Sequence, residues 1–187
     1  MQRLMRTQTN RGFSLLELII AISIFGILAA VSVPSFGTWI ANSKVRSVAE
    51  AMQNGLNLAK AEAVRLNRSV DFRLTNGSPD ATLTATAVAN GKNWMIVNKQ
   101  LMTGETDTFV QGGQFGDLAA NVTVNSNSVA TFTFTPFGRA AGITAPVTIT
   151  VSGTGSNRPL NVMVFPGGDV RLCDPARSIT ASPDGCP

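Results

Sequence analysis

The sequence predicts an α+β protein in which a long N-terminal helix packs on an antiparallel β-sheet head. Three observations support this prediction. An apolar run extends from Phe13 to Val33 with Glu17 as its one charged residue. Apolar and small residues then recur at steps of three and four as far as Leu66, which is typical of one face of a helix. From Ser69 the apolar period changes to two, as in antiparallel strands with one exposed face.

The apolar run is long enough to cross a membrane. At about 1.5 Å of rise per residue, a helix over residues 13–33 is roughly 31 Å long, which matches the hydrocarbon core of a bilayer. The carboxylate of Glu17 lies inside this run, where a charge costs about 2.5–3.5 kcal/mol on insertion scales. We therefore expect this carboxylate to have a partner.

Charge is distributed unevenly around this run. The chain carries fifteen Lys and Arg against eleven Asp and Glu, a net charge of +4. Arg3, Arg6 and Arg11 precede Gly12, whereas residues 34–43 carry no charge. The positive-inside rule then places the first residues in the cytoplasm and the remainder across the membrane. Most of the basic excess precedes Gly12, so the net charge does not indicate a nucleic-acid-binding head.

The residues around Gly12 resemble the type IV prepilin signature of pilins and pseudopilins. The resemblance rests on a basic leader that ends in Gly12, the sequence Phe-Ser-Leu-Leu-Glu over residues 13–17, and the long apolar run. It implies that a prepilin peptidase cuts between Gly12 and Phe13 and methylates the new N-terminus of Phe13. It also implies that the Glu17 carboxylate meets the N-terminal ammonium of a neighbouring subunit and sets the assembly register. The alternative is a simple uncleaved signal anchor.

The second part of the helix is expected to be amphipathic. Its stripe consists of Val45, Val48, Met52, Leu56, Ala59, Ala63 and Leu66. Pro34 removes a backbone donor, so we expect a helix kink or local unwinding there, with two separate helices as the alternative. The expected organisation is a leader peptide (1–12), a transmembrane and filament-core helix (13–33), an amphipathic helix (34–67) and a periplasmic β-rich head (68–187).

About eight short strands are expected in the head. They cover residues 70–74, 83–88, 94–97, 121–124, 129–135, 147–151, 160–165 and 170–173. The pairs Asn76-Gly77 and Asn90-Gly91 lie between alternating runs and predict hairpin turns. Residues 103–118 are expected to be an irregular connection, with a partner-binding loop as the alternative.

Cys173 and Cys186 lie near the C-terminus. In an exported domain such a pair favours a disulfide over two free thiols or a metal site. Closing this loop is expected to contribute about 3 kcal/mol to stability.

The composition also excludes several chemistries. The chain has no His, which excludes His-based acid–base catalysis, Ser-His-Asp triads and imidazole ligands for a metal. The sequence contains no recognisable metal-ligand cluster, phosphate-binding loop or nucleophile arrangement. We therefore expect that the chain has no catalytic residue and binds no metal or cofactor, and that it is not an enzyme.

The head resembles the GspH/FimT group of minor pilins and pseudopilins. This resemblance rests on residues 133–139 and 168–175, and the ending resembles FimT and FimU more than the type II secretion pseudopilin H. It implies a type IV pilin-like fold and a minor pilin that primes or caps type IV pilus assembly. Implied partners are other minor pilins, the major pilin, the prepilin peptidase, the inner-membrane assembly platform and the membrane, which the chain spans once. The implied location is the inner membrane, then the pilus at the cell surface.

Two alternative functions remain: the type II secretion pseudopilin H and a pilus-associated DNA receptor for natural transformation. Some FimT-like proteins bind DNA through a Gly-Arg-x-Arg element in the last hairpin. Here Asp169 replaces the first Arg of that element and only Arg171 matches. The candidate DNA contacts are Arg158, Arg171 and Arg177. Because nearby acidic residues balance them, we expect weak DNA binding at most.

Overall fold

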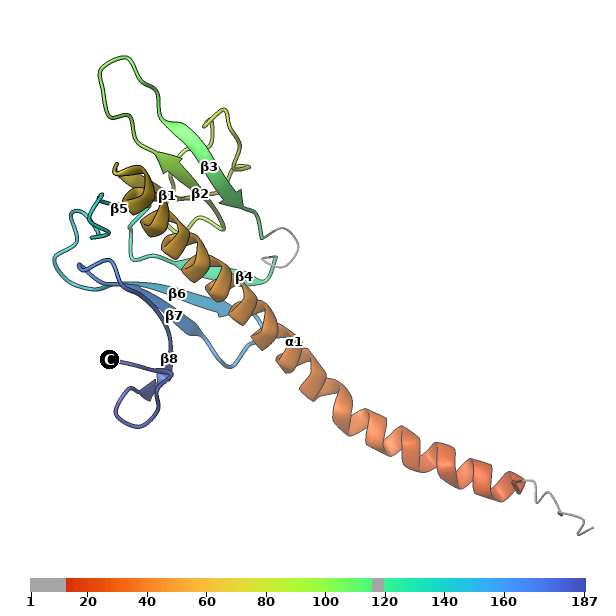
Figure 1. The fold of residues 1–187 in the computed structure, drawn as a ribbon. Coiled ribbons are helices and arrows are strands. Elements are labelled where there is room, and N and C mark those ends of the chain that lie inside the picture. Colours follow the sequence, from red (N-terminus) through yellow and green to blue (C-terminus); the bar gives the residue numbers. More distant parts are fainter. Residues whose placement is uncertain (1–12, 116–119) are drawn as a thin grey trace, which may run out of the picture. The chain divides into compact units, whose positions relative to one another are not determined.

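The computed structural model describes residues 13–115 and 120–187, without the side chains of residues 30–35. The chain divides into an N-terminal unit that ends at Gly37 and a head that begins at Thr38. Helix α1 (Leu15–Leu66) continues through Pro34 without a break, so the alternative of two separate helices is wrong (Figure 1). The side chain of Pro34 lies outside the described residues, and the kink stays a prediction.

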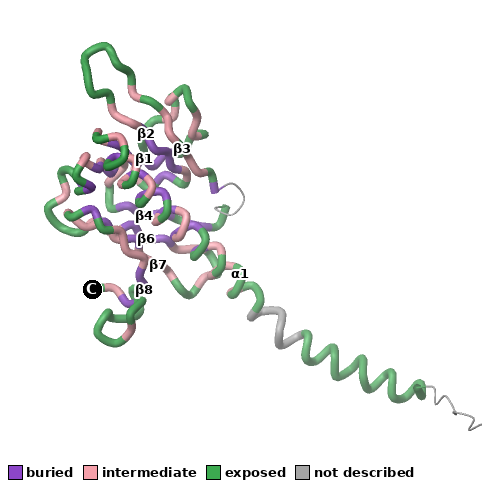
Figure 2. The backbone as a smooth tube through the Cα atoms, in the orientation of Figure 1, coloured by how far each residue is buried: buried purple, intermediate pink, exposed green. Residues whose placement is uncertain are grey.

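Within the head, α1 buries one face. Its fully buried residues are Val45, Val48, Ala49, Met52, Leu56, Ala59 and Ala63. This list confirms the predicted stripe, except that Leu66 is only half-buried and Ala49 was not predicted. Arg46 and Glu50 form an ion pair of 2.7 Å on the exposed side of the helix. The amphipathic pattern arises because this part of α1 covers the core of the head (Figure 2).

The strands form two sheets, where one was expected. Their bounds are β1 (Val70–Thr75), β2 (Asn93–Asn98), β3 (Thr108–Gly113), β4 (Val122–Asn125), β5 (Thr131–Phe134), β6 (Val147–Gly153), β7 (Leu160–Val164), β8 (Val170–Ser178) and β9 (Gly185–Cys186). The first sheet has the order β3-β2-β1-β5 and the second the order β4-β6-β7-β8-β9. Neighbouring strands are antiparallel, except that β9 pairs with β8 in parallel.

Both sheets share one hydrophobic core with α1. In the first sheet, the rings of Phe72 and Trp94 stack with centroids 5.4 Å apart. Gly55 allows the helix to approach this pair, because a Cβ there would lie 2.8 Å from Cε2 of Phe72. At the second sheet, a Cβ at Gly153 would lie 2.9 Å from Cγ2 of Val45. One helix face therefore packs against both sheets (Figure 1).

The predicted strand over residues 83–88 is wrong. These residues belong to an irregular connection between β1 and β2, and Leu83 has a φ of 54°, which a strand does not accommodate. The physical reason is that β1 already has β2 on one side and β5 on the other. Along residues 70–73 neither edge of β1 is free for an alternating segment that follows it; beyond them, the amide of Val88 makes one hydrogen bond of 2.8 Å to the Leu74 carbonyl.

The predicted turns and the predicted irregular segment also need correction. Asn76-Gly77 and Asn90-Gly91 do not connect hairpin strands, because β1 pairs with β2 across the whole connection. Asn90 instead binds a second loop, since its Oδ1 accepts a hydrogen bond of 2.7 Å from the amide of Ser126. Residues 103–118 contain β3, which was expected to be irregular, while residues 116–118 lie outside the described residues.

The face of the first sheet opposite α1 carries an ion-pair network that the sequence did not predict. Arg73 lies 2.9 Å from both Asp71 and Asp107. Burial alone would raise the pKa of the Asp107 carboxyl, but the Gln100 amide and the Arg73 guanidinium outweigh it and hold this pKa below its ordinary value. These pairs connect the loop before β3 to β1, so they are part of the scaffold.

Candidate functional site

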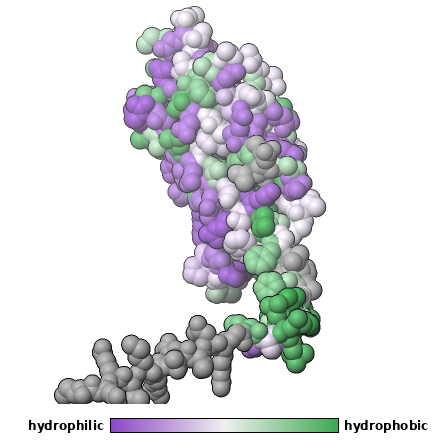
Figure 3. Space-filling model, turned by 90° about the vertical axis from the view of Figure 1, so that its right-hand side faces the viewer, coloured by the Kyte–Doolittle hydropathy of each residue, from purple (hydrophilic) through white to green (hydrophobic). Residues whose placement is uncertain are grey.

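The N-terminal part of α1 presents an unusually exposed apolar surface. The exposed large side chains of α1 here include Leu15, Leu16, Leu18, Ile19, Ile20, Ile22, Ile24, Phe25 and Ile27, and Phe13 precedes the helix. Phe13 is 86% exposed and Phe25 is 73% exposed. Figure 3 shows strongly hydrophobic residues gathered on this helix, whereas the face of the head in view is largely polar. Apolar surface of this extent marks a contact site for lipid or protein.

The first turn of α1 places Glu17 close to the N-terminus expected after processing. The amide of Glu17 donates a hydrogen bond of 3.2 Å to Oγ of Ser14, which caps the helix. The signal for this cap is the Ser-x-x-Glu spacing of Ser14 and Glu17, a common helix start. Glu17 is exposed, and within the described residues its carboxylate has no ion pair. Gly12, the other side of the predicted cleavage point, lies outside the described residues.

Across the residues that the structure describes, no helix is both long and apolar enough to cross a membrane.

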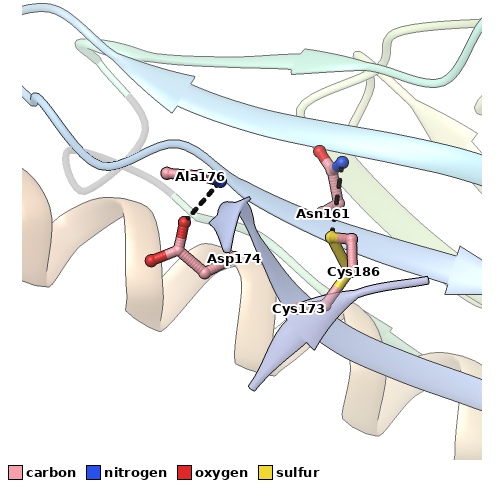
Figure 4. The surroundings of a disulfide bond; sticks show 5 residues. All are labelled: Asn161, Cys173, Asp174, Ala176 and Cys186. Atoms are coloured by element: carbon pink, nitrogen blue, oxygen red, sulfur yellow. Dashed lines mark hydrogen bonds between the residues drawn. A yellow bond between two sulfur atoms is a disulfide. The ribbon is translucent and has the colours of Figure 1, made fainter. Parts of the chain in front are cut away.

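The C-terminal end of the head is closed by the predicted disulfide. Cys173 on β8 and Cys186 on β9 are bonded, with their Cα atoms 5.0 Å apart (Figure 4). This bond confirms the expected pairing over free thiols or a metal site. Nδ2 of Asn161 on β7 lies 3.8 Å from the Cys186 sulfur, so a hydrogen bond also links β9 to β7.

Removing this bond is expected to weaken the head. A full chain with both Cys173→Ser and Cys186→Ser should lose about 3 kcal/mol of unfolding free energy, because the unfolded chain regains the freedom of the open loop. Urea unfolding in detergent micelles, followed by the fluorescence of the buried Trp94, measures the loss. Reductant should weaken the natural chain by the same amount and leave the double variant unchanged; equal sensitivity of both chains would contradict the prediction.

Asp174, next to Cys173, gathers two of the three candidate DNA-binding residues. Its carboxylate lies 2.8 Å from Nη2 of Arg158 and 3.8 Å from Nε of Arg177. Arg177 also lies 2.8 Å from Asp184. The Arg158 hydrogen bond, with one from the amide of Ala176, holds the pKa of the Asp174 carboxyl below its ordinary value (Figure 4).

Replacement of this buried carboxylate is expected to give a pH-dependent loss of stability. Asp174→Asn should lower the unfolding free energy by about 2 kcal/mol at pH 7, because Arg158 loses its charged partner. A lowered pKa stabilises the fold above the ordinary pKa of Asp and ceases to do so as pH falls through the folded value. The difference from the natural chain should therefore be constant at neutral pH and shrink below about pH 4. Thermal unfolding between pH 2 and 7 measures it.

Asp184→Asn is the matched control for this change. The Asp184 side chain is 54% exposed, so its pair with Arg177 is screened by water and its loss should have a smaller effect. An equal effect of the two substitutions would show that burial of Asp174 is not the cause.

The third candidate DNA contact, Arg171, lies apart from the other two. It is a half-buried residue of β8 that pairs across the sheet with Met163. Asp169, the residue that departs from the Gly-Arg-x-Arg pattern, lies 3.5 Å from Nζ of Lys60. The structure thus joins Arg158 and Arg177 through Asp174 and leaves Arg171 outside this group; DNA contact stays an untested prediction.

A cleft of about 410 Å3 opens beside the same acidic residue. Its walls come from the start of the helix in the head and from the C-terminal strands, and include Trp39, Arg46, Leu160, Leu172 and Asp174. The sequence did not predict this cleft. The one sequence signal for this cleft was the position of Trp39, in an uncharged stretch directly after the apolar run. The wall of the cleft opposite Trp39 comes from residues more than a hundred positions further along the chain, so the sequence could not reveal it.

Similarity to known proteins agrees with this division into a helix and a head. A family model described as "Type II transport protein GspH" matches residues 48–185, and one described as "Prokaryotic N-terminal methylation motif" matches residues 7–33. The type IV major fimbrial protein FimA of Dichelobacter nodosus is 27% identical over 120 residues, which are 59% of this chain and 74% of the relative. Fimbrial protein EcpC of Eikenella corrodens is 28% identical over 132 residues, which are 66% of this chain and 82% of the relative.

Among solved structures, the type IV minor pilin FimU of Pseudomonas aeruginosa has a similar fold. The TM-score is 0.53 at 19% identity, over 74% of this chain and 95% of FimU. This likeness confirms the predicted pilin-like fold of a long helix on an antiparallel head. Because the GspH model covers most of the head and the methylation motif covers the start of the apolar helix, the chain belongs to the GspH family of minor pilins and pseudopilins.

Proposed function

We propose that this chain is a minor pilin of the FimU and FimT kind that primes or caps the assembly of a type IV pilus. The observation that carries this proposal is the exposed apolar segment of residues 13–29, which contains the start of α1 with Glu17 in its first turn. Each large apolar side chain left in water forgoes about 1.5–3 kcal/mol of burial. Such a helix therefore requires lipid before assembly and neighbouring helices afterwards.

Processing would turn the N-terminus into part of the assembly site. The prepilin peptidase removes residues 1–12, cutting between Gly12 and Phe13, and methylates the new amine of Phe13. The chain is held in the inner membrane by the helix of residues 13–33, with the head in the periplasm. The inner-membrane assembly platform then transfers it into the pilus, where other minor pilins and the major pilin are its neighbours.

Glu17 would fix how far one helix is shifted along the next. The Phe13 ammonium of one subunit and the Glu17 carboxylate of its neighbour attract each other strongly where water is excluded. Each charge alone would bear its full desolvation cost, which the contact offsets in one register only. The methylated amine keeps its positive charge, so processing preserves the attraction.

The similarity to fimbrial proteins favours a pilus. FimA, EcpC and FimU are described as fimbrial or type IV pilus proteins, and the chain spans most of each of them. A second candidate function is that of a type II secretion pseudopilin, which the description of the GspH family model favours. A minor pilin and a pseudopilin share the apolar helix and its processing. They differ in the assembly that they enter, which is a type IV pilus or a type II secretion pseudopilus.

A deletion strain of the native host separates these functions. We expect loss of surface pili, with normal protein secretion, and recovery of pili when the natural chain is supplied in trans. DNA uptake, scored in the same strains, tests the receptor alternative. Loss of secretion with normal pili would replace the proposal by the pseudopilin function. Mass spectrometry of the protein from its host should show a methylated Phe13 as the first residue; an intact Met1 would contradict the processing.

A further inference from the structure

Two turns in the head have the same backbone hydrogen bonds. In the turn after β5, the amide of Thr135 donates to the Arg139 carbonyl at 2.9 Å and the amide of Gly138 to the Thr135 carbonyl at 2.8 Å. In the turn between β7 and β8, Phe165 and Gly168 make the equivalent bonds to Asp169 and Phe165, also at 2.9 and 2.8 Å. Both turns use a left-handed glycine, with φ of 73° at Gly138 and 85° at Gly168. We call them the first and second turn.

The two turns brace each other. The amide of Ala140, just after the first turn, donates to the carbonyl of Pro166 in the second at 3.2 Å. Gly168 lies so close to the first turn that a Cβ there would run into the carbonyl oxygen of Gly138. The first turn is therefore fixed by its own hydrogen bonds and by its neighbour.

This braced turn holds a large aromatic side chain in water. Phe137 is 87% exposed, more than any other large hydrophobic residue that the structure describes in the head. The turn lies on α1, since a Cβ at Gly138 would be 3.4 Å from Cγ2 of Val64 and 3.4 Å from Cε of Lys60. Val64 is itself 54% exposed. We define the Phe137 surface as Lys60, Val64, Phe137 and Arg139.

The charges of the Phe137 surface are unequal. Lys60 has an acidic partner, Asp169, at 3.5 Å. Arg139 is exposed and forms no ion pair with any described residue of the chain. The surface therefore presents an exposed aromatic ring on a fixed backbone turn, an aliphatic side chain and one guanidinium that has no ion pair among the described residues.

We propose that the Phe137 surface binds another subunit of the pilus or pseudopilus, one that offers an apolar pocket with a carboxylate at its rim. The inference rests on the proposed function for the nature of this partner. Aromatic and arginine side chains are those that dominate protein–protein binding energies. Because the backbone of the turn is already fixed, burial of the Phe137 ring costs little backbone entropy. The unpaired Arg139 specifies the sign of the charge that the partner must supply.

Nucleic acid fits this surface less well. Affinity for DNA comes mainly from several phosphate contacts, each made by a cation. Here Arg139 is the one cation of the surface without a carboxylate partner, and the Asp169 carboxylate beside Lys60 repels phosphate. Phe137 offers a single ring on which a base could stack, whereas binding of a nucleic-acid strand combines several stacked bases with a row of cations.

Photo-crosslinking in the native host tests the proposal with the full chain. The photoreactive analogue benzoylphenylalanine replaces Phe137, or replaces the exposed Thr123 on β4 as the matched control site. We expect a crosslink from position 137 to a pilin or pseudopilin subunit, at least tenfold above position 123, with an Asp or Glu close to the crosslinked peptide. No excess over position 123, or a crosslink to nucleic acid, would overturn the proposal.

A charge exchange then tests the role assigned to Arg139. Arg139→Glu should reduce the crosslink from position 137 about tenfold, and replacing the partner's carboxylate with lysine should restore it. Arg139→Lys keeps the charge and should retain most of the crosslink. An unchanged yield with Arg139→Glu would overturn the assigned chemistry. Thermal unfolding of each variant confirms that the head is intact.

A third position separates this inference from the proposed function. Benzoylphenylalanine at Ile20, in the apolar helix, should crosslink to other pilin subunits if the chain assembles as proposed. Crosslinks from position 20 without any from position 137 would reject the Phe137 surface alone. Their absence from both positions would reject assembly itself.

Discussion

Replacing Glu17 with leucine is expected to reduce incorporation of this chain into pili about a hundredfold. In the proposed assembly, the substitution removes the carboxylate but leaves the positive amine of Phe13 on the neighbouring subunit. An uncompensated charge in a water-free core costs about 3 kcal/mol, which corresponds to two orders of magnitude in an equilibrium. Quantitative immunoblotting of sheared pili, against the amount in the membrane, measures the change. Glu17→Gln keeps the shape without the charge and should be nearly as defective.

Ser23→Ala is the matched control in the same helix. Ser23 is polar and exposed, and its hydroxyl donates to the carbonyl of Ile19 at 2.8 Å, so the change removes a polar group without touching a charge. Its incorporation should be normal. If the Glu17→Leu chain enters pili at the level of the Ser23→Ala chain, the register role of Glu17 is wrong.

Gly168→Ala is expected to cause the largest loss of stability among single-methyl changes in the head, about 3 kcal/mol or more. The left-handed backbone at Gly168 costs about 1–2 kcal/mol for a residue with a Cβ. The added Cβ also collides with the backbone carbonyl of Gly138, which cannot rotate away as a side chain would. Overpacking of this kind adds about 1–3 kcal/mol. Urea unfolding of the full chain in micelles, followed by Trp94 fluorescence, measures the loss.

Gly167→Ala is the control, one residue earlier in the same turn. A Cβ at Gly167 would meet no atom within 4 Å, and its backbone is not left-handed. Its unfolding free energy should be within about 0.5 kcal/mol of the natural chain, as for other surface substitutions. Equal losses at the two positions would show that the braced turns are not rigid.

Sequence patterns predicted the strands best where turn signals and tertiary pairing agree. The predicted segments at 147–151 and 160–165 correspond to β6 and β7, which pair with each other as neighbours in the chain. The segment over residues 83–88 has the same alternation, but both edges of β1 along residues 70–73 are taken by β2 and β5. Local alternation reports which side chains would share a face; it carries no information on whether an edge is free.

The candidate site shows the same division. The exposed helix, Glu17 near its start and the Cys173–Cys186 pair were all predicted from the sequence, because each depends on residues close together or on composition. For the group of Arg158, Arg177 and Asp174, the sequence predicted only that three arginines, the third being Arg171, are balanced by nearby acidic residues. Their ion pairs became visible when β8 placed Asp174 beside both guanidinium groups.

By itself, the sequence determined that this chain has an apolar helix with one acid in its first turn and an amphipathic continuation. These features follow from residue type and a local period, and a helix needs no distant partner to make its hydrogen bonds. Only the tertiary structure decided that the head has two sheets, that two glycine turns brace each other, and that Phe137 stands exposed beside an unpaired Arg139. Those features depend on contacts between segments far apart in the chain, and no local pattern encodes which segments meet.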